Sequence, residues 1–102
     1  MVKAILPELL QDPNTEVKVA AIKTASRLQV EGVENTLLNF VKSDGSEKVR
    51  ATALDALFNL KSQRLDEALE TALADRSKEV RSAALEILPK SSLQEAVAVN
   101  LL

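Results

Sequence analysis

The chain has 102 residues, of which 46% are hydrophobic and 27% charged, and its formal net charge is −2. These values are typical of one folded domain that can bury a core, and so weak a negative charge attracts neither nucleic-acid phosphates nor anionic membranes. The sequence contains no Cys and no His. Disulfides, zinc–thiolate sites and His-based catalytic triads are therefore excluded, and no apolar run has the length of a membrane span.

Hydrophobic residues recur at helical spacing along the whole chain, and no stretch alternates in the way that a strand does. The spacing predicts seven helices, at about residues 2–11, 15–28, 33–43, 46–61, 65–74, 77–88 and 92–102. Asp-containing turns separate the members of each pair, and Pro89 ends the sixth helix. That helix is expected to bury Val80, Ala84, Leu85 and Leu88.

One local pattern occurs three times, namely an Asp followed five residues later by Val and then by a cation. Its copies are Asp12/Val17/Lys18, Asp44/Val49/Arg50 and Asp75/Val80/Arg81. Asn14, Ser46 and Ser77 follow these Asp residues at equivalent places, where each is suited to cap a helix N-terminus. A repeat with one apolar face must stack on the next copy to bury that face. The sequence therefore predicts an all-α, right-handed α-solenoid of antiparallel helix pairs.

The predicted solenoid is a single domain over residues 1–102. Its repeats span about residues 2–28, 32–61 and 64–89, followed by a half repeat at 91–102. The first helix begins directly with apolar residues and the last has no polar closing face. We therefore expect a piece of a longer repeat protein. The alternative is a complete small protein that associates end to end through Val97, Leu101 and Leu102.

The three Asp/Val/cation units, each followed by an Ala–Leu stripe, resemble HEAT repeats, and their short period is similar to that of the compact HEAT-like subclass in bilin-lyase-type proteins. The resemblance covers nearly the whole chain. It implies an Asp–cation ladder, in which turn Asp residues and the following cations join adjacent repeats and have structural roles: Asp12, Asp44, Asp75, Lys18, Arg50 and Arg81. The family's Pro in the first helix of a pair is matched only by Pro7, which lies closer to the Asp than usual.

The stretch from Ala72 to Leu85 has a weaker resemblance to the HEAT segment of large bacterial exported haem-binding and sugar-dehydrogenase-like proteins. In those proteins the solenoid links a catalytic propeller to a cytochrome module. None of the haem or propeller motifs is present in this chain. This resemblance implies a linker or docking segment without chemistry of its own.

The sequence offers little for catalysis. The usual general base near neutral pH is missing, and Gly32 and Gly45, the two glycines, cannot build a phosphate-binding loop. Acidic groups at Asp66/Glu67/Glu70 and Glu31/Glu34 could form a metal site or an acid–base pair. Acids at helix starts that complement the helix dipole are the favoured interpretation. We expect no enzyme activity, no cofactor and no metal site.

The second helix of each pair is expected to line a concave surface, and this surface is the predicted binding face. Its outward charges are mixed in sign, which argues against nucleic acid. The candidate partner contacts are Phe58, Lys23, Asp55 and Glu86. Phe58 is interpreted either as an exposed contact or as a side chain packed under a neighbouring helix. The cation column Lys18/Arg50/Arg81 could track phosphates or acidic peptides, but the structural ladder is favoured.

These observations predict a non-catalytic protein–protein interaction or scaffold module. The alternative is a structural linker or docking segment of a multidomain bacterial exported oxidoreductase, and nucleic-acid binding along the concave face ranks third. The expected partner is a protein or a neighbouring domain of the parent chain, without nucleic acid or membrane. The residues do not indicate a compartment.

Overall fold

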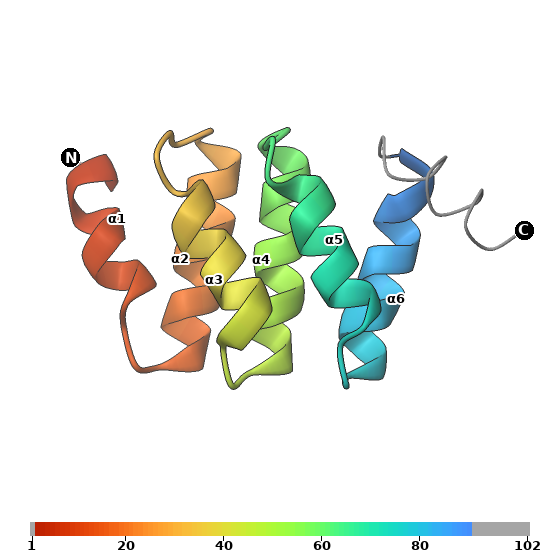
Figure 1. Ribbon diagram of the computed structural model, residues 1–102. Helices are drawn as coiled ribbons and strands as arrows, with labels where there is room; N and C mark the ends of the chain where they lie inside the picture. Colours follow the sequence, from red (N-terminus) through yellow and green to blue (C-terminus); the bar gives the residue numbers. More distant parts are fainter. Residues whose placement is uncertain (1, 91–102) are drawn as a thin grey trace, which may run out of the picture.

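The computed structural model describes residues 2–90, which form two layers of antiparallel helices (Figure 1). The first layer contains α1 (Val2–Leu10), α3 (Glu34–Ser43) and α5 (Leu65–Leu73). The second contains α2 (Thr15–Arg27), α4 (Glu47–Asn59) and α6 (Lys78–Ile87), and a short 3-10 turn (Leu88–Lys90) follows. In the second layer α4 packs between α2 and α6, and it also contacts α3 and α5. The central helix α4 is therefore covered on three sides.

The all-helical prediction is confirmed for the described part of the chain, where residues 2–90 contain six α-helices and no strand. The seventh predicted helix, at 92–102, lies outside the described residues, and so do Val97, Leu101 and Leu102. The sixth helix ends at Ile87, slightly earlier than expected. Pro89 lies in the 3-10 turn that follows, since it lacks the N–H that a continuing α-helix needs.

Each helix of the second layer starts at the capping residue that the sequence predicts. Asn14, Ser46 and Ser77 have extended backbones, and their side-chain oxygens accept backbone N–H groups from the first turn. The Asp two residues earlier accepts the N–H of the capping residue itself, at 2.8 Å for Asp12, 2.9 Å for Asp44 and 2.8 Å for Asp75. Two side chains thus shape each turn, all at the lower end of the helices in Figure 1.

The ends of α2 and α4 also repeat each other. Gln29 (φ 54°) and Lys61 (φ 53°) both adopt the left-handed conformation just past the helix. The next N–H then reaches back to a carbonyl in the last turn, from Val30 to Ala25 and from Ser62 to Leu57, both at 3.0 Å. This is the Schellman arrangement, which most often places Gly at the left-handed position. Both chain reversals are therefore built with residues that adopt this conformation at an energetic cost.

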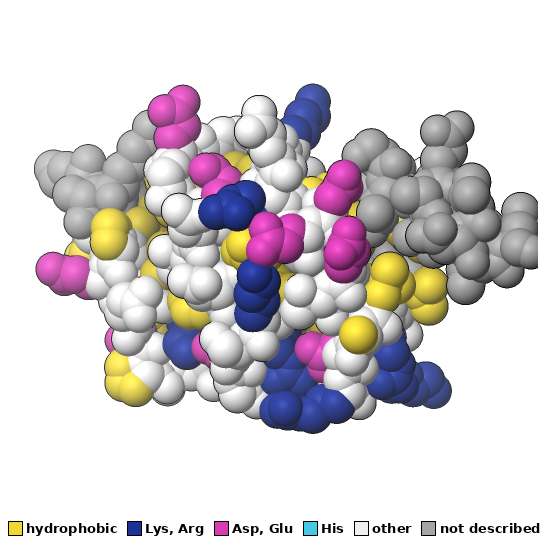
Figure 2. All heavy atoms as spheres, viewed as in Figure 1, with side chains coloured by type: hydrophobic (Ala, Val, Ile, Leu, Met, Phe, Trp, Pro, Cys, Tyr) yellow, Lys and Arg dark blue, Asp and Glu magenta, His cyan; other side chains and the backbone are white. Residues whose placement is uncertain are grey.

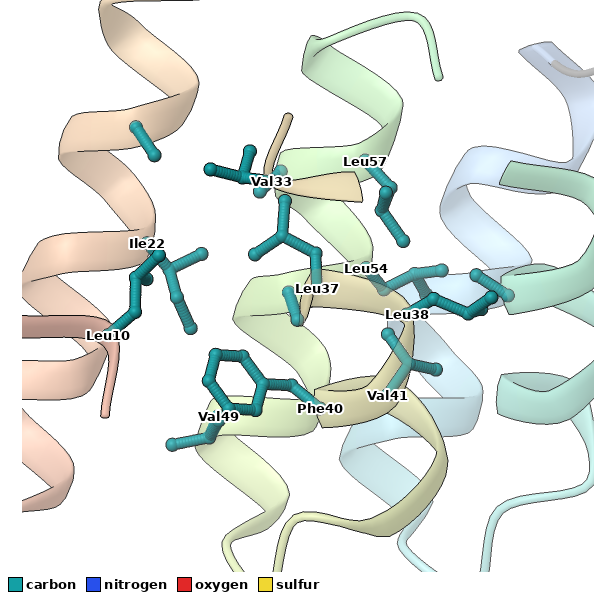
Figure 3. Close-up of a cluster of buried hydrophobic side chains, with 14 of the residues drawn as sticks. Leu10, Ile22, Val33, Leu37, Leu38, Phe40, Val41, Val49, Leu54 and Leu57 are labelled. Atoms are coloured by element: carbon teal, nitrogen blue, oxygen red, sulfur yellow. The ribbon is translucent and has the colours of Figure 1, made fainter. Parts of the chain in front are cut away.

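The core lies between the two layers (Figure 3). Leu37, Leu38 and Val41 project from α3, and Ile22 on α2 and Leu54 on α4 lie at equivalent positions and are fully buried. Small residues lie at a second set of equivalent positions, where Ala21, Ala53 and Ala84 are all buried. Small side chains let neighbouring helices approach closely, which is how the two layers maintain dense packing.

Leu85 departs from the repeat pattern, and the prediction that it is buried is wrong. It is 58% exposed, whereas Ile22 and Leu54 at the equivalent positions are fully buried. Leu54 is covered because α3 and α5 both pack against α4. Within residues 2–90 no first-layer helix follows α6, so among the first-layer helices α6 packs chiefly against α5. Leu85 thus occupies the same repeat position as Ile22 and Leu54, but the helices packed around it differ.

Candidate functional site

The first contact between adjacent repeats joins Lys18 on α2 to the turn before α4. The Lys18 Nζ donates a hydrogen bond to Asp44 Oδ2 at 2.7 Å. The same Nζ lies 5.4 Å from the centre of the Phe40 ring, within the range of a cation–π interaction. Phe40 itself is buried, as the sequence predicts. The cation therefore connects the charged turn to the core.

The second contact joins Arg50 on α4 to the turn before α6 and is more buried. Arg50 Nε donates to Asp75 Oδ2 at 2.9 Å, and Arg50 Nη2 donates to Asp75 Oδ1 at 3.1 Å. The two side chains are 5% and 8% exposed. The third nitrogen, Nη1, donates to the Asp44 backbone carbonyl at 2.8 Å. This two-point geometry requires a planar guanidinium, which Lys cannot supply.

The electrostatics of Asp75 reflect this arrangement. Burial of its carboxylate acts to raise the pKa. Hydrogen bonds from Arg50 and from the Ser77 N–H, together with the charges of Arg50 and Arg76, outweigh burial and hold the pKa below its ordinary value. The contacts of Asp75 therefore favour the ionised form of its carboxyl group.

The other residues of the Asp–cation ladder form contacts of a different kind. Arg81 Nη1 donates to the Asp75 backbone carbonyl at 2.8 Å, as Arg50 does to that of Asp44. Asp12 accepts the Asn14 N–H. Seen from the side of α3 and α5, cationic and acidic side chains lie beside one another along the lower edge of the molecule (Figure 2). Within residues 2–90 the ladder thus has two ion-paired rungs, Lys18–Asp44 and Arg50–Asp75.

One contact between repeats is not predicted by the repeated sequence pattern. Ser77, the buried N-cap of α6, donates its hydroxyl to Glu47 Oε2 at 2.8 Å while its oxygen accepts N–H groups of its own helix. The positions equivalent to Glu47 hold Thr15 and Lys78, so the repeat gives no signal for this contact. It adds a second link between α4 and α6 beside the Arg50–Asp75 pair.

A groove of about 590 Å³ runs between α2 and α4 on the side of the second layer. We call it the α2–α4 groove, and it is lined by Lys23, Ser26, Arg27, Gln29, Thr52, Asp55, Ala56 and Asn59. Its small lining residues, Ser26 and Ala56, are buried. Lys23 and Arg27 line it from α2, whereas Asp55 and Asn59 line it from α4, and all four are exposed. The groove therefore combines small buried residues with charged and amide groups.

Gln29 braces one end of this groove. Its side-chain Nε2 donates to the Ser26 carbonyl at 3.1 Å and lies 3.4 Å from the Asn59 carbonyl. The first bond supplies a donor to the end of α2, where carbonyls lack helical partners, and the second reaches the end of α4. The two helices that line the groove are thereby connected at their C-terminal ends.

Three of the candidate partner contacts lie in one row across the second layer. Lys23, Asp55 and Glu86 occupy equivalent positions on α2, α4 and α6, and all three are exposed. Removal of water from around the carboxylate raises the pKa of Asp55, the charge of Glu86 raises it further, and Lys23 opposes the shift. None of the four ion pairs within residues 2–90 includes any of the three. We refer to these residues as the charge row.

The structure thus brings Lys23 and Asp55 to one groove, with Glu86 on the neighbouring helix. Phe58, the fourth candidate, is half-buried, packs against the core and does not line the groove. Ser26, Thr52 and Gln29 were not identified from the sequence. Thr52 lies one turn before Asp55, so helical spacing could have indicated it, whereas Gln29 lies where the hydrophobic pattern breaks.

Neither a metal centre nor a membrane span emerges from the described residues. No group of three or more Asp or Glu side chains in this part of the chain is arranged to hold a metal ion. None of its helices has both the length and the hydrophobicity needed to cross a membrane. The chemistry available at the surface is therefore that of charged and amide side chains.

Comparison with known proteins identifies the repeat. No curated protein and no solved structure matches the chain. The family model of HEAT repeats matches residues 2–99, which is nearly the whole sequence. Such repeats are commonly scaffolds for protein interaction. Together with the stacked helix pairs and the repeated Asp turns, this match establishes that the chain belongs to the HEAT-repeat family.

Proposed function

We propose that this chain is a non-catalytic protein-interaction module that binds an extended segment of a partner in the α2–α4 groove. The observation that carries the proposal is the groove itself, which holds about 590 Å³ and is lined by two small buried residues, Ser26 and Ala56. Small side chains let a partner backbone approach the helices closely. A volume of this size is in the range of binding sites for small ligands, so it suits a few residues of an extended chain.

The polar groups of the groove support a peptide over an apolar ligand. Thr52, Asn59 and Gln29 offer both donors and acceptors, which a peptide backbone can use. Lys23 and Arg27 on one wall face Asp55 on the other, so charges of both signs are available for partner side chains. A surface of mixed sign is a poor match for a uniformly negative phosphate backbone. Protein is therefore the partner class that the groove favours.

Selection from a random library of displayed peptides of about a dozen residues tests the proposal. The purified chain is immobilised, and bound peptides are sequenced and measured individually by fluorescence polarisation. Thr52→Trp places a large ring in the groove, and Asn59→Trp does so from an exposed position that should tolerate it. The matched control is Thr36→Trp, a half-buried Thr on α3 in the other layer.

We expect selected peptides to lose binding to Thr52→Trp and Asn59→Trp and to keep it with Thr36→Trp. Circular dichroism of every variant separates loss of binding from loss of fold. A library that yields no peptide above the blank surface contradicts the proposal. So does a set of peptides that the two groove variants bind as well as the unaltered chain.

A further inference from the structure

We infer that the charge row selects a partner segment with a basic side chain, which lies between Asp55 and Glu86, and with an acidic side chain toward Lys23 and Arg27. The inference rests on the proposed function and adds the chemistry of the bound segment. It follows from the order of the helices. Because α2, α4 and α6 lie side by side, the row presents one cation followed by two acids.

The two acids are placed unfavourably for the free protein. Asp55 and Glu86 act on each other as like charges, and neither belongs to any ion pair within residues 2–90. The charge of Lys23, which lines the other side of the groove, lowers the pKa of Asp55, but the two residues form no ion pair. A guanidinium or ammonium group bound between the acids would replace repulsion with attraction.

Four ion pairs occur within residues 2–90, and three of them join adjacent repeats. Arg50 and Asp75 pair at two points, Lys18 pairs with Asp44, and Lys42 and Glu67 pair at 2.6 Å on the first layer. The fold therefore compensates charge where two repeats meet. The charge row also spans adjacent repeats but has no ion pair of its own within residues 2–90, so a bound segment can supply the partner charges.

The opposite wall of the groove gives the segment a direction. Lys23 and Arg27 lie one helical turn apart on α2, and both line the groove that Asp55 closes on the α4 side. A carboxylate on the bound segment would face this pair of cations while its basic residue faces the acids. A segment with its charges in the reverse order would place like charges together on both walls.

Sequencing the displayed peptides selected above tests the inference, with three variants compared in parallel. Asp55→Asn/Glu86→Gln removes the two acids of the row. Lys23→Gln/Arg27→Gln removes the cations. Glu8→Gln/Glu70→Gln is the matched control, because it neutralises two exposed acids on α1 and α5 and changes the net charge equally.

We expect peptides selected on the unaltered chain to be enriched in Arg or Lys and to lose about tenfold or more in affinity for Asp55→Asn/Glu86→Gln. The control variant should bind them unchanged. Lys23→Gln/Arg27→Gln should relax the preference for an acid and leave that for a base. The readout includes thermal unfolding, since the two acid substitutions should stabilise the free protein while they weaken its binding.

Peptides that bind the groove but show no enrichment in basic residues overturn the inference and leave the proposed function standing. Basic peptides that bind Asp55→Asn/Glu86→Gln and Glu8→Gln/Glu70→Gln with equal affinity also overturn the inference and leave the proposed function standing. The net charge of the protein alone would then explain the preference for basic peptides. A library without any bound peptide contradicts both the proposed function and the inference that rests on it.

Discussion

Arg50 joins two consecutive turns of the stack, because it clamps the Asp75 carboxylate at two points while its Nη1 holds the Asp44 carbonyl. One side chain thus satisfies a buried acid in the next repeat and a backbone group in its own. Both members of the pair are almost completely buried. Desolvation makes such a pair expensive to form but still more expensive to break from one side.

Replacement of Arg50 should therefore destabilise the fold strongly. We expect Arg50→Ala to lower the free energy of unfolding by about 3–5 kcal/mol, because it leaves the Asp75 charge buried without its partner. Arg50→Lys should recover part of this loss, since an ammonium keeps the charge but not the two-point geometry. Urea denaturation followed by circular dichroism measures all three proteins.

The exposed pair Lys42–Glu67 supplies the control for this measurement. Its side chains are 42% and 46% exposed, so solvent screens the pair and Lys42→Ala should destabilise the fold far less than Arg50→Ala. If Arg50→Ala and Lys42→Ala lowered the free energy of unfolding equally, the buried Arg50–Asp75 pair would not stabilise the fold more than the exposed pair.

The depressed pKa of Asp75 makes stability fall in acid. The ordinary pKa of an Asp side chain is 3.8. Burial acts to raise the pKa of Asp75, but the hydrogen bonds from Arg50 and Ser77 outweigh it, so the folded-state pKa is lower than the ordinary value. The stabilisation is therefore fully present above about pH 4 and is lost as the pH falls through the folded-state pKa. Asp75→Asn should be less stable than the unaltered chain at about pH 7, and this difference should shrink toward about pH 2. A pH series of urea denaturations measures it, and a constant difference would contradict the assignment.

Asp55 should show the opposite pH dependence. Partial loss of water around its carboxylate and the charge of Glu86 raise the pKa of Asp55 above the ordinary 3.8, so the folded state binds the proton more tightly than the unfolded chain. The penalty is absent well below the unfolded-state pKa and grows as the pH rises through the folded-state pKa. Asp55→Asn should consequently be more stable than the unaltered chain at about pH 7 and lose this advantage in acid. Thermal unfolding at both pH values measures the sign, and a destabilised Asp55→Asn at neutral pH would refute it.

The left-handed residues at the ends of α2 and α4 predict a gain from glycine. Lys61 adopts φ 53° without a hydrogen bond from its side chain within the described residues, so Lys61→Gly should raise the free energy of unfolding by about 0.5–1 kcal/mol. Gln29→Gly should gain less or lose stability, because the Gln29 side chain bonds to the carbonyls of Ser26 and Asn59. Chemical denaturation of the two variants checks the order, and a larger gain for Gln29→Gly would contradict it.

The sequence was most informative where physical signals are local and repeated. The caps at Asn14, Ser46 and Ser77 and the helical spacing of the apolar residues identify the elements, because both act within one turn of a helix. The buried Ala positions follow from the same periodicity. These signals do not depend on how distant parts of the chain meet, so they can be read without a structure.

Contacts that depend on neighbouring helices were harder to predict. Leu85 repeats Ile22 and Leu54 in sequence, yet its exposure depends on which helix covers it. Glu47 reaches Ser77 only because α4 and α6 are neighbours, and no repeated residue marks that contact. For the candidate site, Lys23 and Asp55 could be named from outward positions, but the groove between them requires the spacing of two helices.

The turn Asp residues have a consequence for the length of such an array. Oδ1 of each turn Asp accepts the N–H of its own capping residue, and Oδ2 of Asp44 and of Asp75 accepts a hydrogen bond from the cation of the repeat before it. The two ion-paired junctions therefore share one plan, although Lys18 bonds to Asp44 at one point and Arg50 bonds to Asp75 at two. Removal of residues 44–74 would join Ser43 to Asp75 and place Lys18 opposite that carboxylate. The chain can in this way gain or lose whole units without the invention of a new junction, since the connector belongs to the unit itself.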